Sequence, residues 1–161
     1  MLYKNNKKGF SLIEIVVGLA IIFLCMVSLF SALQISLRVI NSDTQQIKAG
    51  LLLEEGIEAV KSMRAESWND KIKTLATSTS YYFFFDDNNK EWQATLTSVY
   101  VDSFERKFSV EDVYRDNNDD ITSSGTLDLN TKKVVVLVSW VAENGTTTDS
   151  LSAYITNLFN N

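Results

Sequence analysis

Two hydrophobic patterns divide the chain. Residues 12–40 are almost entirely apolar, whereas residues beyond 80 form short runs of alternating apolar and polar positions. No charged residue occurs from Ile15 to Leu37, a run of 23 residues. At about 1.5 Å per residue, a helix of that length crosses a hydrocarbon layer roughly 30 Å thick. The first pattern therefore predicts a membrane-spanning helix near the start of the chain.

Residues 41–64 continue this helix in amphipathic form. Their apolar positions recur at steps of four and three, as Leu53, Ile57, Val60 and Met63. Such a stripe is typical of a helix that packs on a globular head. Gly50 and Gly56 each weaken a helix by up to about 1 kcal/mol relative to Ala, but a residue without a side chain also permits close approach of a neighbour.

The remainder of the chain predicts antiparallel strands. The runs are rich in Val, Thr and aromatic residues and are bounded by Asn, Asp and Gly; they are Tyr81–Phe85, Trp92–Val101, Phe104–Tyr114, Val134–Val141 and Leu151–Ile155. The Asn144-Gly145 pair between the last two runs predicts a closing hairpin with a loop of several residues. Trp140 and Tyr154 are expected to pack within this hairpin, and a platform for a ligand is the alternative role for them. The fold class is then α+β, with one long N-terminal helix packed on a small antiparallel sheet.

The segment Lys7-Lys8-Gly9-Phe10-Ser11-Leu12-Ile13-Glu14 carries the most specific signal. It resembles the type IV prepilin family, whose leader ends in Gly and whose mature chain begins with Phe and has Glu at its fifth position. The resemblance implies a pilin-like fold, cleavage between Gly9 and Phe10 by a prepilin peptidase, and N-methylation of Phe10. It also implies residues 1–9 as leader, 10–37 as transmembrane and assembly helix, 38–68 as its amphipathic continuation and 69–161 as a β-rich head.

Glu14 lies at one end of the predicted span, where a carboxylate is costly and indicates a functional role. Cleavage would create an amine on Phe10, and Glu14 of an adjacent subunit would meet that amine and fix the axial register of the helices. At an effective dielectric constant of about 20, such a pair 4 Å apart is worth on the order of 4 kcal/mol before desolvation is subtracted. The alternative is that Glu14 stays hydrated near the lipid headgroups.

Basic residues predict the orientation of the span. Lys4, Lys7 and Lys8 precede it and no acidic residue does, so the leader is expected in the cytoplasm and the head outside. Loss of these lysines changes fifteen basic residues to twelve against twenty acidic ones, so the net charge of −5 becomes −8. An acidic surface gives no reason to expect direct nucleic-acid binding. We expect a single-pass protein of the cytoplasmic membrane that then enters an extracellular or periplasmic filament.

Other features favour a minor subunit. The chain has no Pro, and Ser31 stands where major pilins usually carry one, which predicts an unbroken helix. The segment 51–68 and the terminal segments 131–140 and 151–157 resemble minor pilins of the pilus modification type and the minor pseudopilin I of type II secretion. The expected partners are other pilin or pseudopilin subunits, the prepilin peptidase and an inner-membrane assembly platform. Because Cys25 is the only cysteine, an intramolecular disulfide is excluded.

One loop resembles half of a calcium-binding loop. Asp116, Asn118 and Asp120 place oxygen atoms at alternate positions, as in the first half of an EF-hand. The second half differs, because Ile121 occupies the sixth position instead of Gly and Leu127 the twelfth instead of Glu. Calcium is thus one expectation for this loop, and an Asx turn without a cofactor is the other.

Catalysis is not expected. The chain has no His, which excludes His-based triads and His-ligated zinc. Glu105 and Glu111 leave an anchored glycoside hydrolase as a weak alternative. A surface adhesin or receptor with an uncleaved anchor, which would use the aromatic run Tyr81–Phe85, is the main alternative to a filament subunit. The mature N-terminus discriminates, because the filament interpretation requires loss of residues 1–9.

Overall fold

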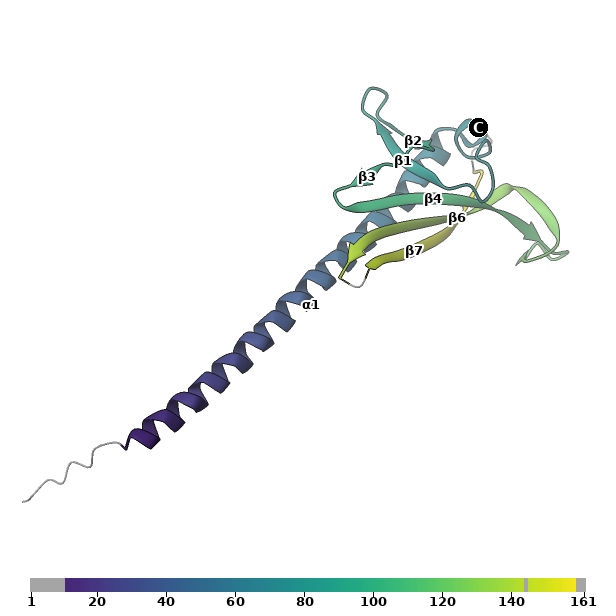
Figure 1. Ribbon diagram of the computed structural model, residues 1–161. Helices are drawn as coiled ribbons and strands as arrows, with labels where there is room; N and C mark the ends of the chain where they lie inside the picture. The colour runs from purple at the N-terminus through teal and green to yellow at the C-terminus, as the bar shows by residue number, and fades with distance from the viewer. Residues whose placement is uncertain (1–10, 144, 159–161) are drawn as a thin grey trace, which may run out of the picture. The chain divides into compact units, whose positions relative to one another are not determined.

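The computed structural model describes residues 11–143 and 145–158, which form two helices and seven strands (Figure 1). The cleavage site at Gly9 and Phe10 lies outside these residues. The helices are α1 (Leu12–Glu66) and α2 (Trp68–Lys71), and the strands are β1 (Tyr81–Asp86), β2 (Glu91–Thr95), β3 (Tyr100–Val101), β4 (Phe104–Arg115), β5 (Ile121–Thr122), β6 (Thr126–Ala142) and β7 (Gly145–Thr156). The chain divides into two compact units, and the division falls inside α1, between Thr44 and Gln45.

The second unit contains the sheet. Its strands follow the order β2-β1-β4-β6-β7, and the short strands β3 and β5 also pair with β4. Every pair is antiparallel. The long β4, β6 and β7 form the centre and one edge, as Figure 1 shows. The α+β class and the helix-on-sheet arrangement predicted from the sequence are confirmed.

The core of this unit lies between one face of the sheet and the last turns of α1. The predicted stripe is confirmed, because Leu53, Ile57, Val60 and Met63 are all buried. They belong to one apolar cluster with residues of β1, β4, β6 and β7, including Phe83, Phe108, Val110, Val134, Val136, Val138 and Ile155. The pleating of the strands explains why these residues share one face of the sheet, since alternate residues of β4 and β6 point toward the helix.

Gly56 marks the closest approach of α1 to the sheet. A Cβ atom at this position would lie 2.7 Å from Cγ1 of Val136 and 3.3 Å from Cζ of Phe83. Gly50 is different, because a Cβ there would meet nothing within 4 Å. Of these two glycines, only Gly56 is therefore required by packing.

Three strand predictions were wrong in their bounds, two of them before the closing hairpin. The run predicted as Trp92–Val101 is split into β2 and β3, because the Thr95 hydroxyl accepts a hydrogen bond from the Thr97 amide at 3.2 Å and Leu96 turns outward. Strand β6 begins at Thr126, eight residues before the predicted Val134. Its first part pairs with the end of β4 beyond a register irregularity at Asp112 and Val113. Leu127 and Leu129 alternate with polar residues there, a short signal that the prediction did not use.

The closing hairpin is tighter than predicted. Ala142 pairs with Gly145, so only positions 143 and 144 separate the paired residues, instead of a loop of several residues. Strand β7 begins at Gly145, six residues before the predicted Leu151, and the β propensity of the Thr residues after Gly145 explains this difference. Trp140 packs as predicted, with its ring centroid 5.8 Å from that of Phe104. Tyr154 does not, because 53% of it is exposed.

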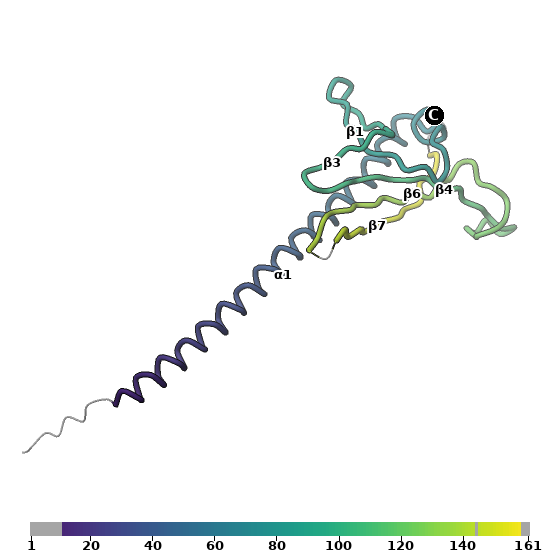
Figure 2. The backbone as a smooth tube through the Cα atoms, in the orientation of Figure 1, coloured from purple at the N-terminus to yellow at the C-terminus, as the bar shows by residue number. Residues whose placement is uncertain are grey.

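Residues 113–131, which we call the arm, extend the sheet beyond its apolar core. In Figures 1 and 2 the arm projects from the end of β4 before the chain returns along β6. Arg115 holds it together: its Nε donates to Asp128 at 2.6 Å and its Nη1 donates to the backbone oxygen of Asp119 at 2.7 Å. A Cβ at Gly125 would lie 2.2 Å from the Arg115 carbonyl oxygen, so the turn before β6 requires glycine. The arm is thus a specifically ordered element.

Candidate functional site

The first turn of α1 contains the acidic residue expected to act in assembly. The helix begins at Leu12, and the Ser11 carbonyl accepts hydrogen bonds from the amides of Glu14 at 3.0 Å and Ile15 at 3.2 Å. Glu14 is exposed. A carboxylate in the first helical turn is stabilised by the helix dipole, by about 0.3–1 kcal/mol at an exposed position. Glu14 is therefore compatible with a helix that starts here, and its charge remains accessible to another molecule.

The apolar half of α1 is open on all sides. Its large side chains are about half to four-fifths exposed, from 47% for Val27 to 79% for Leu12. Within the described residues, α1 is the one helix long and apolar enough to cross a membrane by length and composition, with a mean hydropathy of 2.8 over its best 18-residue window. An apolar surface of this extent is typical of a segment that contacts lipid or other helices.

Two hydroxyl groups in the apolar half of this helix are bonded to its own backbone. Ser28 donates to the Leu24 carbonyl at 2.9 Å, and Ser31 donates to the Val27 carbonyl at 3.0 Å. These bonds satisfy the hydroxyl donors without water, as a hydrocarbon environment requires. The helix continues through Ser31 without a break, which confirms the prediction made from the absence of Pro.

Comparison with known proteins bears on this end of the chain. A family model for the prokaryotic N-terminal methylation motif matches residues 4–30, which include Gly9, Phe10 and Glu14. The N-terminal segment thus has the motif of type IV prepilin-like proteins. No curated protein and no solved structure matches the chain. The motif and the apolar helix that follows it support membrane anchoring through α1 and association with other subunits of the pilin type.

The head contains the three residues predicted as calcium ligands. Asp116 Oδ1 accepts hydrogen bonds from the amides of Asn118 at 2.8 Å and Asp120 at 3.0 Å. This is the geometry of an Asx turn, and Asp119 adopts a positive φ of 68° within it. Among the described residues, no group of three or more His, Cys, Asp or Glu side chains is arranged to hold a metal ion. Calcium binding by this loop stays a prediction of the sequence.

The two carboxylates considered for hydrolysis lie on β4 and have separate partners. Glu105 accepts a hydrogen bond from the Tyr82 hydroxyl at 3.0 Å, and Glu111 pairs with Lys133 at 3.0 Å.

The aromatic run considered for adhesion is divided between core and surface. Phe83 is buried, whereas Phe84 is 48% exposed.

Sequence reasoning missed a buried cation. Arg106 is only 4% exposed and lies on the helix-facing side of β4, between Phe104 and Phe108. Its guanidinium carbon lies 4.9 Å from the centre of the Phe83 ring, and its Nη1 lies 3.0 Å from a carboxylate oxygen of Glu55 on α1. The alternation of β4 was the available signal, since it places position 106 on the same face as the two phenylalanines.

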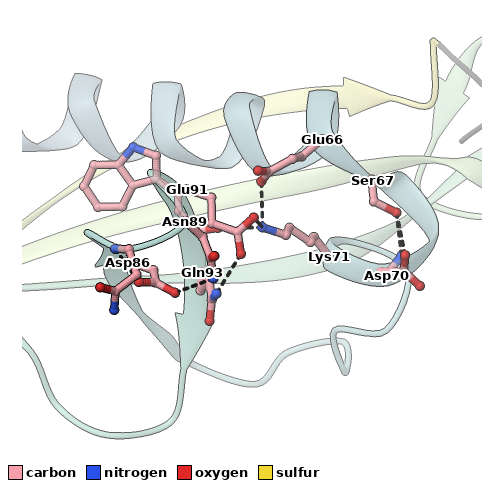
Figure 3. A network of polar contacts seen from close by, with 10 residues as sticks. Glu66, Ser67, Asp70, Lys71, Asp86, Asn89, Glu91 and Gln93 are labelled. Atoms are coloured by element: carbon pink, nitrogen blue, oxygen red, sulfur yellow. Dashed lines mark hydrogen bonds and ion pairs between the residues drawn. The ribbon is translucent and has the colours of Figure 1, made fainter.

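A polar network fastens β2 to the end of α1 (Figure 3). Lys71 Nζ lies 2.6 Å from Glu66 and 2.8 Å from Glu91, and it donates to the Trp92 carbonyl at 3.3 Å. The hydrogen bond from Lys71, with a further one from Gln93, lowers the pKa of Glu91 to about 2. Burial alone would lower the pKa of Lys71, but its bonds to the two glutamates raise it. The network therefore favours the charged form of each partner.

Acid should weaken the head through Glu91. Its carboxyl pKa is lower in the folded chain than the ordinary value of 4.5, so its contribution to the free energy of unfolding is complete above about pH 4.5 and is lost as the pH falls toward 2. We expect the urea midpoint of the unmodified chain to fall over this interval, and to fall less in Glu91→Gln. Glu54→Gln, on an exposed part of α1, serves as the control and should keep the original pH profile. Equal acid sensitivity of both variants would contradict the role of Glu91.

Proposed function

We propose that this prepilin-like chain is a minor pilin or pseudopilin, a structural subunit of a type IV pilus-like or type II secretion filament. The observation that carries the proposal is the methylation motif over residues 4–30, directly continuous with an exposed apolar helix. A helix whose apolar side chains are open all round can be stored in a membrane and later surrounded by other helices. The head is built separately, around a core that begins at Ala49.

Cleavage of the leader would be required before the subunit can enter a filament. Before cleavage, the nitrogen of Phe10 belongs to a peptide bond and carries no charge. Cleavage after Gly9 produces an amine, and Glu14 of a neighbouring subunit offers it a carboxylate at the first turn of α1. Only a processed subunit would then gain the ion pair that fixes the register. Lys4, Lys7 and Lys8 support an orientation with this end inside and the head outside.

Intact mass spectrometry of the chain from its native membrane tests the proposal. The expected mass is that of residues 10–161 plus one methyl group. Gly9→Leu should abolish the processed species, because the peptidase motif loses its glycine, and the full-length mass should replace it. Gly18→Leu is the control, since its position is open in the helix and lies beyond the cleavage site; it should be processed normally.

A different result would favour another function. If the unmodified chain retains residues 1–9 in cells that process other prepilins, the filament interpretation is wrong and the uncleaved membrane-anchored adhesin or receptor becomes the better assignment. If Gly9→Leu is still shortened by nine residues, the cleavage mechanism proposed here is wrong.

A further inference from the structure

The arm and the open face of the sheet enclose a groove with a volume of about 490 Å³. This volume falls within the range of about 300–1,000 Å³ typical of small-molecule sites. The groove is lined by parts of β4, β5, β6 and β7, including Tyr114 from β4 and Tyr154 from β7. Neither tyrosine belongs to the apolar core cluster of buried residues. The groove is therefore a surface feature on the side of the sheet that α1 does not cover.

Its lining combines aromatic, apolar and hydroxyl groups. Tyr154 is 53% exposed and Ile121 is 45% exposed, although both belong to regular strands. Thr122 and Ser123 add hydroxyl groups from the arm. An exposed aromatic ring beside hydroxyl groups suits a ligand that has both apolar faces and many hydrogen-bonding groups.

The charges of the groove are paired with one another. Lys133 Nζ lies 3.0 Å from Glu111, and Lys132 pairs with Asp112. Each of the two acidic side chains of the lining thus has a cationic partner, although Lys132 itself lies just outside the lining. This pairing disfavours an ionic ligand, because a charged group would have to displace an existing ion pair.

One wall of the groove is the arm, whose conformation is held by side-chain hydrogen bonds. Most of the arm lies outside the apolar core, so burial alone does not account for its conformation. Arg115 nevertheless fastens it through Asp128, and this hydrogen bond raises the pKa of Arg115 and lowers that of Asp128. A wall whose conformation is held by its own hydrogen bonds can present its side chains to a ligand in a fixed arrangement.

We propose that this groove binds an uncharged carbohydrate, with a sugar ring stacked on Tyr154 and its hydroxyl groups bonded to the polar side chains of the lining. The arm supplies one wall through Ile121 and Thr122, and the sheet supplies the other. No residue of the groove belongs to the first unit of the chain, so sugar binding does not require the side chains of the apolar half of α1.

The test is a titration of the whole chain in a detergent without sugar groups. The probes are glucose, galactose, mannose, N-acetylglucosamine and their β-linked disaccharides, with sialic acid as the charged comparison and a neutral hexapeptide as the peptide comparison. Saturation-transfer NMR identifies the bound probe and calorimetry gives its affinity. We expect at least one neutral sugar to bind with a Kd on the order of 1 mM, which is weak binding for a single small ligand.

Variants locate the site. Tyr154→Ala should weaken that binding about tenfold, whereas Tyr100→Ala should leave it unchanged, because Tyr100 is 61% exposed on β3 and does not line the groove. Circular dichroism confirms that both variants remain folded. The proposal is wrong if no neutral sugar binds, if sialic acid or the peptide is preferred, or if Tyr154→Ala binds as tightly as the unmodified chain.

Discussion

Glu14→Gln should reduce incorporation of the processed chain into filaments at least about tenfold while leaving membrane insertion intact. Glutamine keeps the size of the side chain but removes the charge that would meet the Phe10 amine of a neighbour. The ion pair is worth on the order of 4 kcal/mol before desolvation, and a net 1.4 kcal/mol already corresponds to a factor of ten. The measurement is the ratio of subunit in sheared filaments to subunit in membranes.

Two controls distinguish loss of the axial register of the helices from other causes of reduced incorporation. Glu54→Gln removes a carboxylate from an exposed position of the same helix, beyond the apolar half, and should leave the ratio unchanged. Mass spectrometry establishes that Glu14→Gln is still processed, so that a loss of incorporation is not a loss of cleavage. Equal incorporation of Glu14→Gln and the unmodified chain would show that Glu14 stays hydrated near the headgroups, which is the alternative role considered above.

The helical part of the structure was predictable because its signals are local. An uncharged run of 23 residues and a stripe at Leu53, Ile57, Val60 and Met63 both follow from the period of one helix. The start of α1 at Leu12 and the burial of the whole stripe agree with that expectation. The candidate assembly residue was likewise readable from the sequence, since a single acid at the edge of an apolar run stands out without a structure.

The arm was not predictable because its signals are not local. Residues 126–130 alternate Leu127 and Leu129 with polar residues, but this run is too short to indicate its partner, and it pairs with β4 past the irregularity at Asp112 and Val113. Arg115 finds Asp128 thirteen positions away, and no periodicity indicates that pair. The groove depends on the same long-range pairing, so Tyr154 read as a packing residue of the hairpin when it is in fact exposed.

Replacement of Gly56 by a larger residue is expected to cause the largest loss of stability in the head. Gly56→Leu should lower the free energy of unfolding by about 3 kcal/mol, because its Cβ alone would lie 2.7 Å from Val136 Cγ1 and the helix would have to move off the sheet. The three tryptophans, Trp68, Trp92 and Trp140, all belong to the second unit, so their fluorescence during urea unfolding reports on the head alone.

Gly50→Leu is the matched control, with the same chemical change in the same helix. Its Cβ would meet nothing within 4 Å, so only helix propensity changes, and the variant should be about 0.5–1 kcal/mol more stable than the unmodified chain. The two variants are thus expected to differ in sign. Stabilisation by both would mean that α1 does not lie as close to β1 and β6 as this packing requires. Opposite effects would show that the chain has glycine at position 56 because α1 packs closely on the sheet there, although glycine is a poor helix former.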